Sequence, residues 1–126
     1  MLDQITEDIA SEVISAAISV HKILGPGLLE SAYKECLFYE LSSNGIKVEK
    51  EKPIPLVFKK ITLDCVFRAD LVVEDRILLE LKAIEELNSI HMAQMLTYLR
   101  VGDYRLGFLM NFNVRLLKDG IKRIIL

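Results

Sequence analysis

Residues 66–83, which read VFRADLVVEDRILLELKA, decide the fold because they contain two apolar runs separated by a short polar break. Side chains alternate between the two faces of a strand, so each run predicts one apolar stripe that faces a shared core. A hairpin loop at residues 74–76 pairs Val73 with Ile77 and keeps odd-numbered residues opposite one another. The two predicted stripes are Phe67, Ala69, Leu71 and Val73 in the first run, and Ile77, Leu79, Leu81 and Ala83 in the second.

Four charged residues share the other face of this predicted hairpin. The register places Asp70 directly opposite Glu80, and Arg68 opposite Lys82. Opposed carboxylates on neighbouring strands destabilise a sheet by up to about 1 kcal/mol, so this register needs a cation, a shared proton or the diagonal charges of the two basic residues. Because apolar residues frame the cluster, it favours a metal-dependent site, and a solvated checkerboard of charges is the alternative interpretation.

Length and composition indicate a single domain. The 126 residues, with a mass of 14.4 kDa and 52% hydrophobic residues, fit one unit over residues 1–126. A net charge of −2 and a pI near 5.7 argue against a protein that coats nucleic acid through a dominant basic surface. A basic group near the C-terminus predicts either a local phosphate contact or a solvated strand edge: Arg115, Lys118, Lys122 and Arg123.

Nothing in the sequence predicts export or a membrane anchor. The first residues are acidic where a secretory signal would be basic, and no apolar run approaches the roughly 18 residues that span a bilayer. We therefore expect a soluble cytoplasmic protein without a membrane partner. Cys36 and Cys65 lie far apart in apolar surroundings, which predicts reduced core residues and not a disulfide or zinc site.

The hydrophobic spacing predicts two helices, four strands, a third helix and two more strands. The first helix is expected at residues 6–24, with Thr6 as its cap and Gly25-Pro26-Gly27 at its end. The other elements are expected at 28–43 (helix), 46–50, 54–58, 62–73 and 77–83 (strands), 89–101 (helix), and 105–111 and 121–126 (strands). This order predicts the α/β class with a mixed sheet.

Three further polar residues lie on the predicted helices at positions suited to a site. Gln94 and Tyr98 are four residues apart and therefore share one helix face. Glu30 follows the Gly-Pro-Gly break, where a helix N-terminus favours a carboxylate, so helix-end electrostatics also explains it. Structural roles near helix ends are expected for His21 and His91, and a general-base role is the alternative, for which His91 is favoured as the neighbour of the site.

The combined pattern of these motifs resembles the PD-(D/E)XK nuclease superfamily. The residues that carry the resemblance are Glu30, Asp70, Glu80-Leu81-Lys82 and Gln94-x-x-x-Tyr98, the last as in the RecB-like branch. The stretch Gly27-Leu28-Leu29-Glu30-Ser31-Ala32-Tyr33 also resembles the motif of the small GxxExxY proteins, and that likeness extends over nearly the whole chain. Ala69 stands where the superfamily has a proline, which is not a metal ligand.

The resemblance implies a restriction-endonuclease-like core, in which helices flank a mixed central β-sheet. The expected metal is Mg²⁺ or Mn²⁺, since such hard cations select oxygen ligands. Lys82 would orient the nucleophile or stabilise charge in the transition state, and the two polar residues of the later helix would position the substrate or a metal-bound water. The expected metal ligands are Asp70, Glu80, Glu30 and the backbone carbonyl of Leu81, and the expected catalytic residues are Glu30, Asp70, Glu80, Lys82, Gln94 and Tyr98.

The expected function is hydrolysis of phosphodiester bonds in nucleic acid, with DNA favoured over RNA. The alternative is a noncatalytic module that binds nucleic acid or protein and retains the nuclease fold. Because a small domain offers little surface for holding a duplex, a homodimer or a larger complex is also consistent with the sequence.

Overall fold

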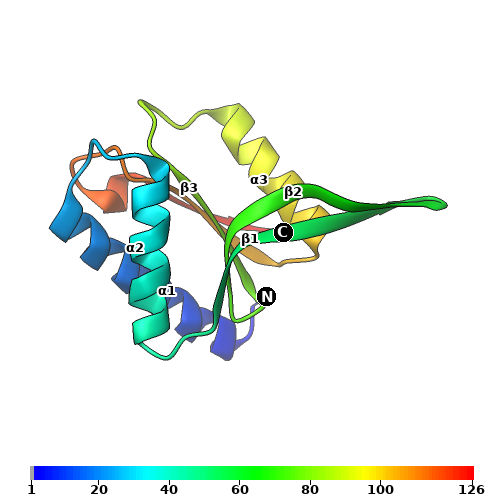
Figure 1. Ribbon diagram of the computed structural model, residues 1–126, viewed down its shortest axis with the longest axis horizontal. Coiled ribbons are helices and arrows are strands. Elements are labelled where there is room, and N and C mark those ends of the chain that lie inside the picture. The colour runs from blue at the N-terminus through cyan, green and yellow to red at the C-terminus, as the bar shows by residue number, and fades with distance from the viewer. Residues whose placement is uncertain (1) are drawn as a thin grey trace.

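A five-stranded mixed sheet forms the centre of the computed structural model, which describes residues 2–126 (Figure 1). The strand order is β1-β2-β3-β4-β5, in which β3 and β4 are parallel and the other neighbours are antiparallel. The predicted α/β class is confirmed. The elements are α1 (Gln4–Leu24), α2 (Glu30–Ser43), β1 (Val48–Phe58), β2 (Ile61–Val73), β3 (Ile77–Lys82), α3 (Ser89–Gly102), β4 (Leu106–Asn111), a 3₁₀ turn (Leu117–Asp119) and β5 (Ile121–Ile125).

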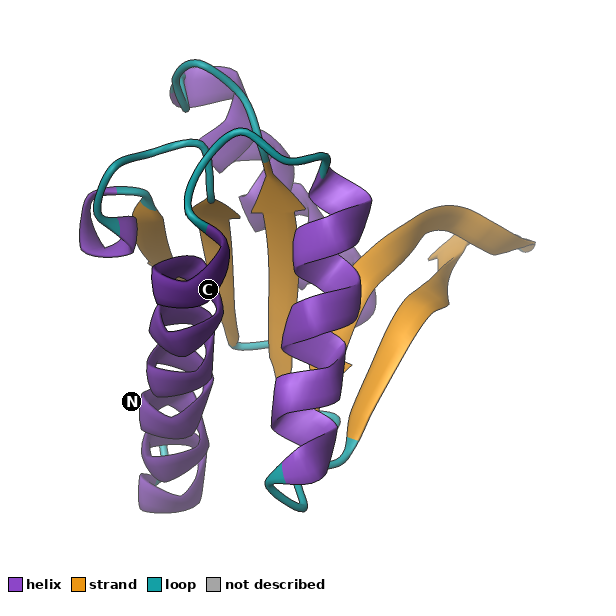
Figure 2. Cartoon of the chain, turned by 60° about the vertical axis from the view of Figure 1, so that its left-hand side comes forward, coloured by secondary structure: helices purple, strands orange, loops and turns teal. Residues whose placement is uncertain are grey.

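Helices cover both faces of the sheet and create two cores (Figure 2). α1 and α2 pack on one face, where Val13 and Leu37 join Leu79 of β3. α3 packs on the other face, where Met95 joins Leu78. Because β3 is covered on both sides, a charged residue inside it must be buried, and this sets the environment of the candidate site.

The ends of α1 and α2 differ from the predicted ones. Thr6 is not the cap of α1: Asp3 is, and its carboxylate accepts a hydrogen bond from the Thr6 amide at 2.7 Å. α2 begins at Glu30 and not at residue 28, because Leu29 keeps an extended backbone. No helix within residues 2–126 combines the length and the apolar content needed to cross a membrane.

β1 is one continuous strand where the sequence predicts two. It passes through Glu51, whose φ of 54° lies in the left-handed region. Lys50 and Lys52 on either side both pair with β2, so the ladder resumes after a single residue. The predicted break is wrong because a distortion of one residue does not end the pairing.

At Asp70 the alternating side chains of β2 switch from one face of the sheet to the other. Leu71 and Val73 pack in the core under α1 and α2, whereas Phe67 and Ala69 pack in the core under α3. The prediction that these four side chains form one stripe is therefore wrong. Asp70 lies between two ladder pairs of β1 and β2 and has no ladder partner of its own, so the alternation is interrupted there.

The predicted three-residue loop between β2 and β3 is confirmed. Val73 pairs with Ile77, and the Arg76 amide donates to the Val73 carbonyl at 2.9 Å. The ladder ends at the pair Leu71–Leu79, however, so the predicted pairing of Arg68 with Lys82 is wrong. β2 leaves β3 before it reaches that level.

Beyond this point β1 and β2 continue as a two-stranded arm, defined here as residues 53–68. Its base packs against α3 through Ile54 and Phe67, and its outer part projects away from the helices (Figure 1). Residues 61–66 are all exposed. Cys65 lies on this arm and Cys36 on an exposed part of α2, so the prediction that both cysteines are core residues is wrong. Both are free thiols.

Candidate active site

Asp70 and Glu80 face each other where β2 and β3 part. The Asp70 amide donates to Oε1 of Glu80 at 3.3 Å, and the Leu81 amide donates to Oδ2 of Asp70 at 2.8 Å. Each carboxylate thus accepts a hydrogen bond from the backbone of the opposite strand, in place of the ladder bonds that end one pair earlier. The two carboxylates are held close together by this reciprocal arrangement.

Burial dominates the electrostatics of Glu80. Glu80 is only 7% exposed. This burial is the largest cause of its raised pKa and the negative charge of Asp70 is the second, and the pKa rises to about 8. The charge of Lys82 acts in the opposite direction but is a smaller effect. At neutral pH the protein without metal therefore holds a proton on this carboxyl pair. A proton is one of the three things, with a cation or the diagonal basic charges, that can stabilise two opposed acids.

Lys82 and Glu30 lie at the end of β3. Lys82 is partly buried and, within residues 2–126, forms no ion pair. Oε2 of Glu30, the first residue of α2, accepts a hydrogen bond from the Ala83 amide at 3.3 Å. In the described part of the chain no three His, Cys, Asp or Glu side chains are grouped so that they could hold a metal ion, so two acids and not three meet directly at this point.

α3 brings Tyr98 to the carboxylates. The Tyr98 ring stacks on Phe67 with 3.8 Å between ring centroids and 8° between planes. Burial raises the Tyr98 pKa, and the negative charges of Glu80 and Asp70 raise it further, which identifies the three as electrostatic neighbours. Gln94, one turn earlier, is exposed and makes no side-chain hydrogen bond to any described residue.

Lys34 and Glu51 also lie beside Asp70, and sequence reasoning did not include them. Nζ of Lys34 is 2.8 Å from Oε1 of Glu51. This hydrogen bond is the largest cause of the raised Lys34 pKa, and the negative charge of Asp70 raises the pKa further. Lys34 follows Glu30 by one helical turn, so the shared helix face was a usable signal. The position of Glu51 depends on its unusual φ and on strand pairing, which no local pattern reveals.

Asn111 fixes the segment that follows Lys82. This buried amide accepts a hydrogen bond from the Ile84 amide at 3.1 Å and donates to the Ile84 carbonyl at 2.9 Å. The next residue, Phe112, donates its amide to the Lys82 carbonyl at 2.8 Å. A polar residue at the end of the apolar strand β4 therefore positions the end of β3 beside it.

The two histidines make structural contacts and do not contact the carboxylates. His21 is buried, and its Nε2 lies 2.8 Å from the Val114 carbonyl. Nδ1 of His91 accepts a hydrogen bond from the Asn88 amide at 3.0 Å in the capping box of α3.

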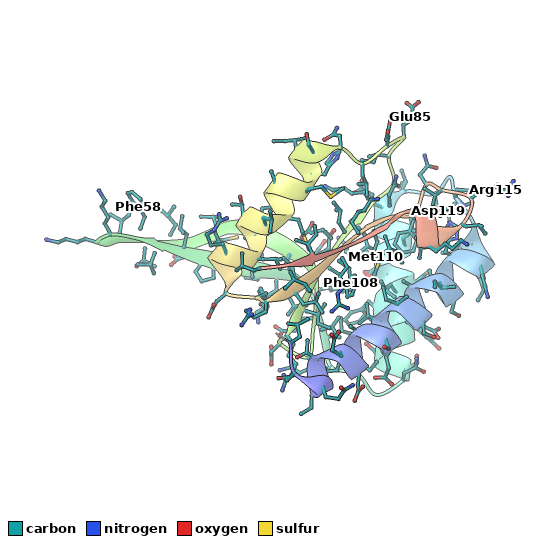
Figure 3. The ribbon with its side chains drawn as sticks, turned by 180° about the vertical axis from the view of Figure 1, so that it is seen from behind. Phe58, Glu85, Phe108, Met110, Arg115 and Asp119 are labelled. Atoms are coloured by element: carbon teal, nitrogen blue, oxygen red, sulfur yellow. The ribbon has the colours of Figure 1, made fainter. Side chains whose placement is uncertain are left out.

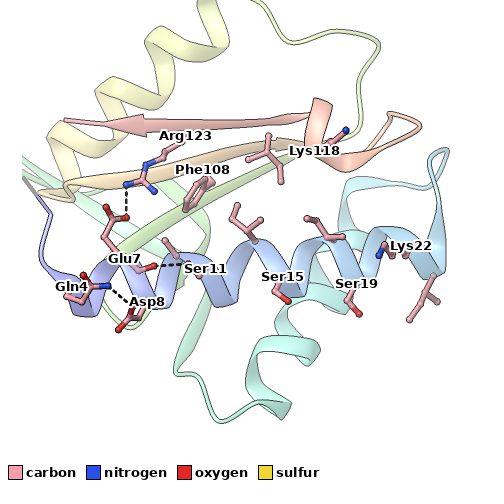
Figure 4. Close-up of a pocket in the computed structure, with 15 residues that line it drawn as sticks. Gln4, Glu7, Asp8, Ser11, Ser15, Ser19, Lys22, Phe108, Lys118 and Arg123 are labelled. Carbon is pink, nitrogen blue, oxygen red and sulfur yellow. Dashed lines mark hydrogen bonds and ion pairs between the residues drawn. The ribbon is translucent and has the colours of Figure 1, made fainter.

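A groove of about 1110 Å³ lies between α1 and the strands β4 and β5 (Figure 4). Ser15 and Ser19 of α1 line it together with Lys22, Phe108 and Lys118. It contains none of the six predicted site residues, so the site is defined here by its chemistry and not by the size of a cavity.

The family comparison agrees with this arrangement of elements. The model of the PD-(D/E)XK nuclease superfamily matches residues 7–124. The chain belongs to the PD-(D/E)XK nuclease superfamily. Neither the curated proteins nor the solved structures contain a match to the chain. The finer likeness to GxxExxY proteins stays a prediction.

Membership in the PD-(D/E)XK nuclease superfamily assigns a nuclease-type function in general, with nucleic acid as the class of substrate. Nucleases of this superfamily generally depend on divalent metal ions. The restriction-endonuclease-like core expected from the sequence is confirmed by the mixed sheet with helices on both faces.

Proposed function

We propose that the chain is a nuclease that uses Mg²⁺ or Mn²⁺ to hydrolyse phosphodiester bonds, with DNA as its substrate. The observation that carries this proposal is the pair of facing carboxylates, Asp70 and Glu80, with Lys82 two residues further along β3. Hard divalent cations select oxygen ligands, and two adjacent carboxylates provide them.

The environment of Glu80 tests whether a divalent cation fits. The Glu80 carboxyl is nearly inaccessible to solvent and has no ion-pair partner within the described residues, so its ionised form lacks a counter-charge. A cation next to Asp70 and Glu80 would supply that charge and stabilise both ionised forms. Mg²⁺ is commonly held by one or two carboxylates together with several waters, which matches a site with two acids in direct contact.

The proposed ligands are Asp70, Glu80 and the Leu81 carbonyl, with Glu30 at the same end of β3. When bound, the ion would lower the pKa of a water molecule and neutralise charge on the phosphodiester. Lys82 would stabilise the negative charge that develops in the transition state. Tyr98 and Gln94, which project from α3, would position the substrate.

Cleavage assays on duplex DNA, single-stranded DNA and RNA with Mg²⁺ or Mn²⁺ test this proposal. Glu80→Gln and Lys82→Ala should each lower the cleavage rate by at least about 100-fold, because each removes a charge that acts in the transition state. Glu85→Gln is the matched control, since Glu85 is an exposed carboxylate on the loop after β3 (Figure 3). It should cleave at the rate of the wild type.

Equal rates in the wild type and both site variants would refute the assignment of these residues. Titration calorimetry with Mg²⁺ gives a second measurement that needs no substrate, because replacing both Asp70 and Glu80 with their amides should abolish binding. Nucleic-acid binding without cleavage under any metal condition would favour a noncatalytic binding module.

A further inference from the structure

We propose that the arm, residues 53–68, is a clamp that enters a groove of duplex DNA beside the candidate active site. This inference rests on the proposed function and adds to it the form of substrate that the protein grips. The arm is continuous with the site, because Asp70 follows Ala69 at the base of the arm on β2.

The arm exposes an apolar face that no helix covers (Figure 3). Phe58 pairs with Ile61, and Leu56 pairs with Leu63, so these four side chains lie on one face of the ribbon. Phe58 is 57% exposed and Ile61 55%. A two-stranded ribbon is only marginally stable in water by itself, which indicates that this face is covered by a partner when the protein acts.

The charge on the arm complements a polyanion. Lys59 and Lys60 occupy the turn at the tip, and Arg68 is exposed near the base, against one acidic residue, Asp64. None of these four forms an ion pair within residues 2–126, although the chain as a whole has a net charge of −2. Nζ of Lys59 lies 5.4 Å from the centroid of the Phe58 ring, so an ammonium group and an aromatic ring are presented together.

These features favour DNA over a second copy of the chain. A stable protein interface takes about 20–30 residues from each side, and the apolar face of the arm has only four. Two identical arms would also bring positive tips to the same assembly. DNA instead offers phosphates to the lysines, and thymine methyl groups in its major groove make apolar contacts with side chains such as phenylalanine.

The form of the duplex follows from the shape of the arm. The major groove of B-form DNA, about 12 Å wide, admits a two-stranded β-ribbon, whereas the major groove of A-form RNA is too narrow for side chains to read. From Asp70 to Ile61 the strand runs nine residues, roughly 30 Å at about 3.3 Å per residue. At about 3.4 Å per base pair, the tip would contact DNA roughly nine base pairs from the phosphate at the carboxylates.

DNA binding measured without cleavage tests the clamp. All proteins carry Glu80→Gln, and fluorescence anisotropy follows a labelled duplex of about 30 base pairs at several salt concentrations. Lys59→Gln/Lys60→Gln should weaken binding and lower the slope of log affinity against log salt by about 2, because two phosphate contacts are lost. Phe58→Ala should weaken binding with an unchanged slope, since its contact is not ionic.

The matched control removes two lysines that lie outside the arm. Lys22→Gln/Lys47→Gln makes the same charge change, on α1 (Figure 4) and just before β1, and should leave the salt slope unchanged. On a duplex of about six base pairs, which is shorter than the roughly nine that the arm spans, the tip variants should bind like the parent protein.

The clamp would be overturned by tip variants that bind the long duplex like the parent, by equal loss from the control pair, or by equal arm-dependent binding of duplex RNA. If sedimentation shows a dimer, and Phe58→Ala dissociates this dimer without changing DNA binding, the arm serves self-association and the clamp is also overturned. Because these assays need no catalysis, arm-dependent binding without cleavage would refute the proposed nuclease activity alone. Cleavage with inert tip variants would refute the clamp alone.

Discussion

The two halves of β2 place similar apolar residues in opposite environments. Leu71, Val72 and Val73 are at most 1% exposed between the helical layers, whereas residues 61–66, which include Ile61 and Leu63, are all exposed. The residue types do not explain this contrast. It arises because β2 leaves β3 at Asp70, so residues 61–66 have no neighbouring layer and residues 71–73 have two. The strand thus contributes to stability on one side of the candidate site and to recognition on the other.

The largest expected effect compares one leucine from each half. Leu71→Ala should lower the free energy of unfolding by about 2–5 kcal/mol, because it removes a fully buried side chain and leaves a cavity. Leu63→Ala makes the same chemical change on the arm and should lower it by less than about 0.5 kcal/mol. Urea unfolding of the two variants and the wild type measures both values.

Similar losses in the two variants would contradict this division of β2. They would mean that the arm is buried against a second chain in solution. The measured mass of the wild type in the same buffer would then exceed that of one chain. A small loss in both would mean that the core under α1 and α2 relaxes around Leu71.

The next effect concerns the border between the halves, where Glu80 keeps its proton. Without metal, the folded state releases this proton near pH 8 and the unfolded chain near the ordinary value of 4.5. Between these values the folded state binds more protons, so the free energy of unfolding falls as the pH rises. Glu80→Gln cannot ionise, and it should match the wild type at the acid end and exceed it, by on the order of a few kcal/mol, above pH 8.

Urea unfolding in EDTA across this pH range measures the difference. The exposed variant Glu85→Gln should keep the slope of the wild type, since Glu85 lies outside the carboxylate pair. Parallel pH profiles for the wild type and Glu80→Gln would show that burial does not hold the proton on this side chain. Such a result would remove the argument that the pair needs a counter-charge.

Local sequence patterns predicted the helices and strands of this fold, except that they divided β1 in two, and they predicted the loop that brings Asp70 to Glu80. The loop at 74–76 fixes the register, and the apolar run of β3 indicates coverage on both faces. The change of face of β2 at Asp70 could not be predicted, because it occurs where strand pairing is interrupted opposite the left-handed backbone of Glu51, which no local pattern reveals. Exposure of Cys65 could not be predicted either, since the arm has the composition of a buried strand.

The same limit explains which site residues were found. Asp70, Glu80 and Lys82 lie on one hairpin, so alternation and register bring them together. Lys34 approaches Asp70 only through the packing of α2 beside β1 and β2, which are long-range contacts. Roles for Glu30 and Gln94 in catalysis stay predictions.

The smallest expected effect concerns the contact between the base of the arm and α3. Phe67, on the arm side of Asp70, stacks on Tyr98 of α3, and such an aromatic pair contributes about 0.5–1.5 kcal/mol beyond the area it buries. A double-mutant cycle of Phe67→Ala and Tyr98→Ala, measured by urea unfolding, should give a coupling energy in this range. Tyr98→Phe is the control that keeps the ring, and it should retain the coupling. If the two alanine substitutions are additive, the arm is not fastened to α3 at Phe67, and the border between the buried and exposed halves of β2 lies at Asp70 itself.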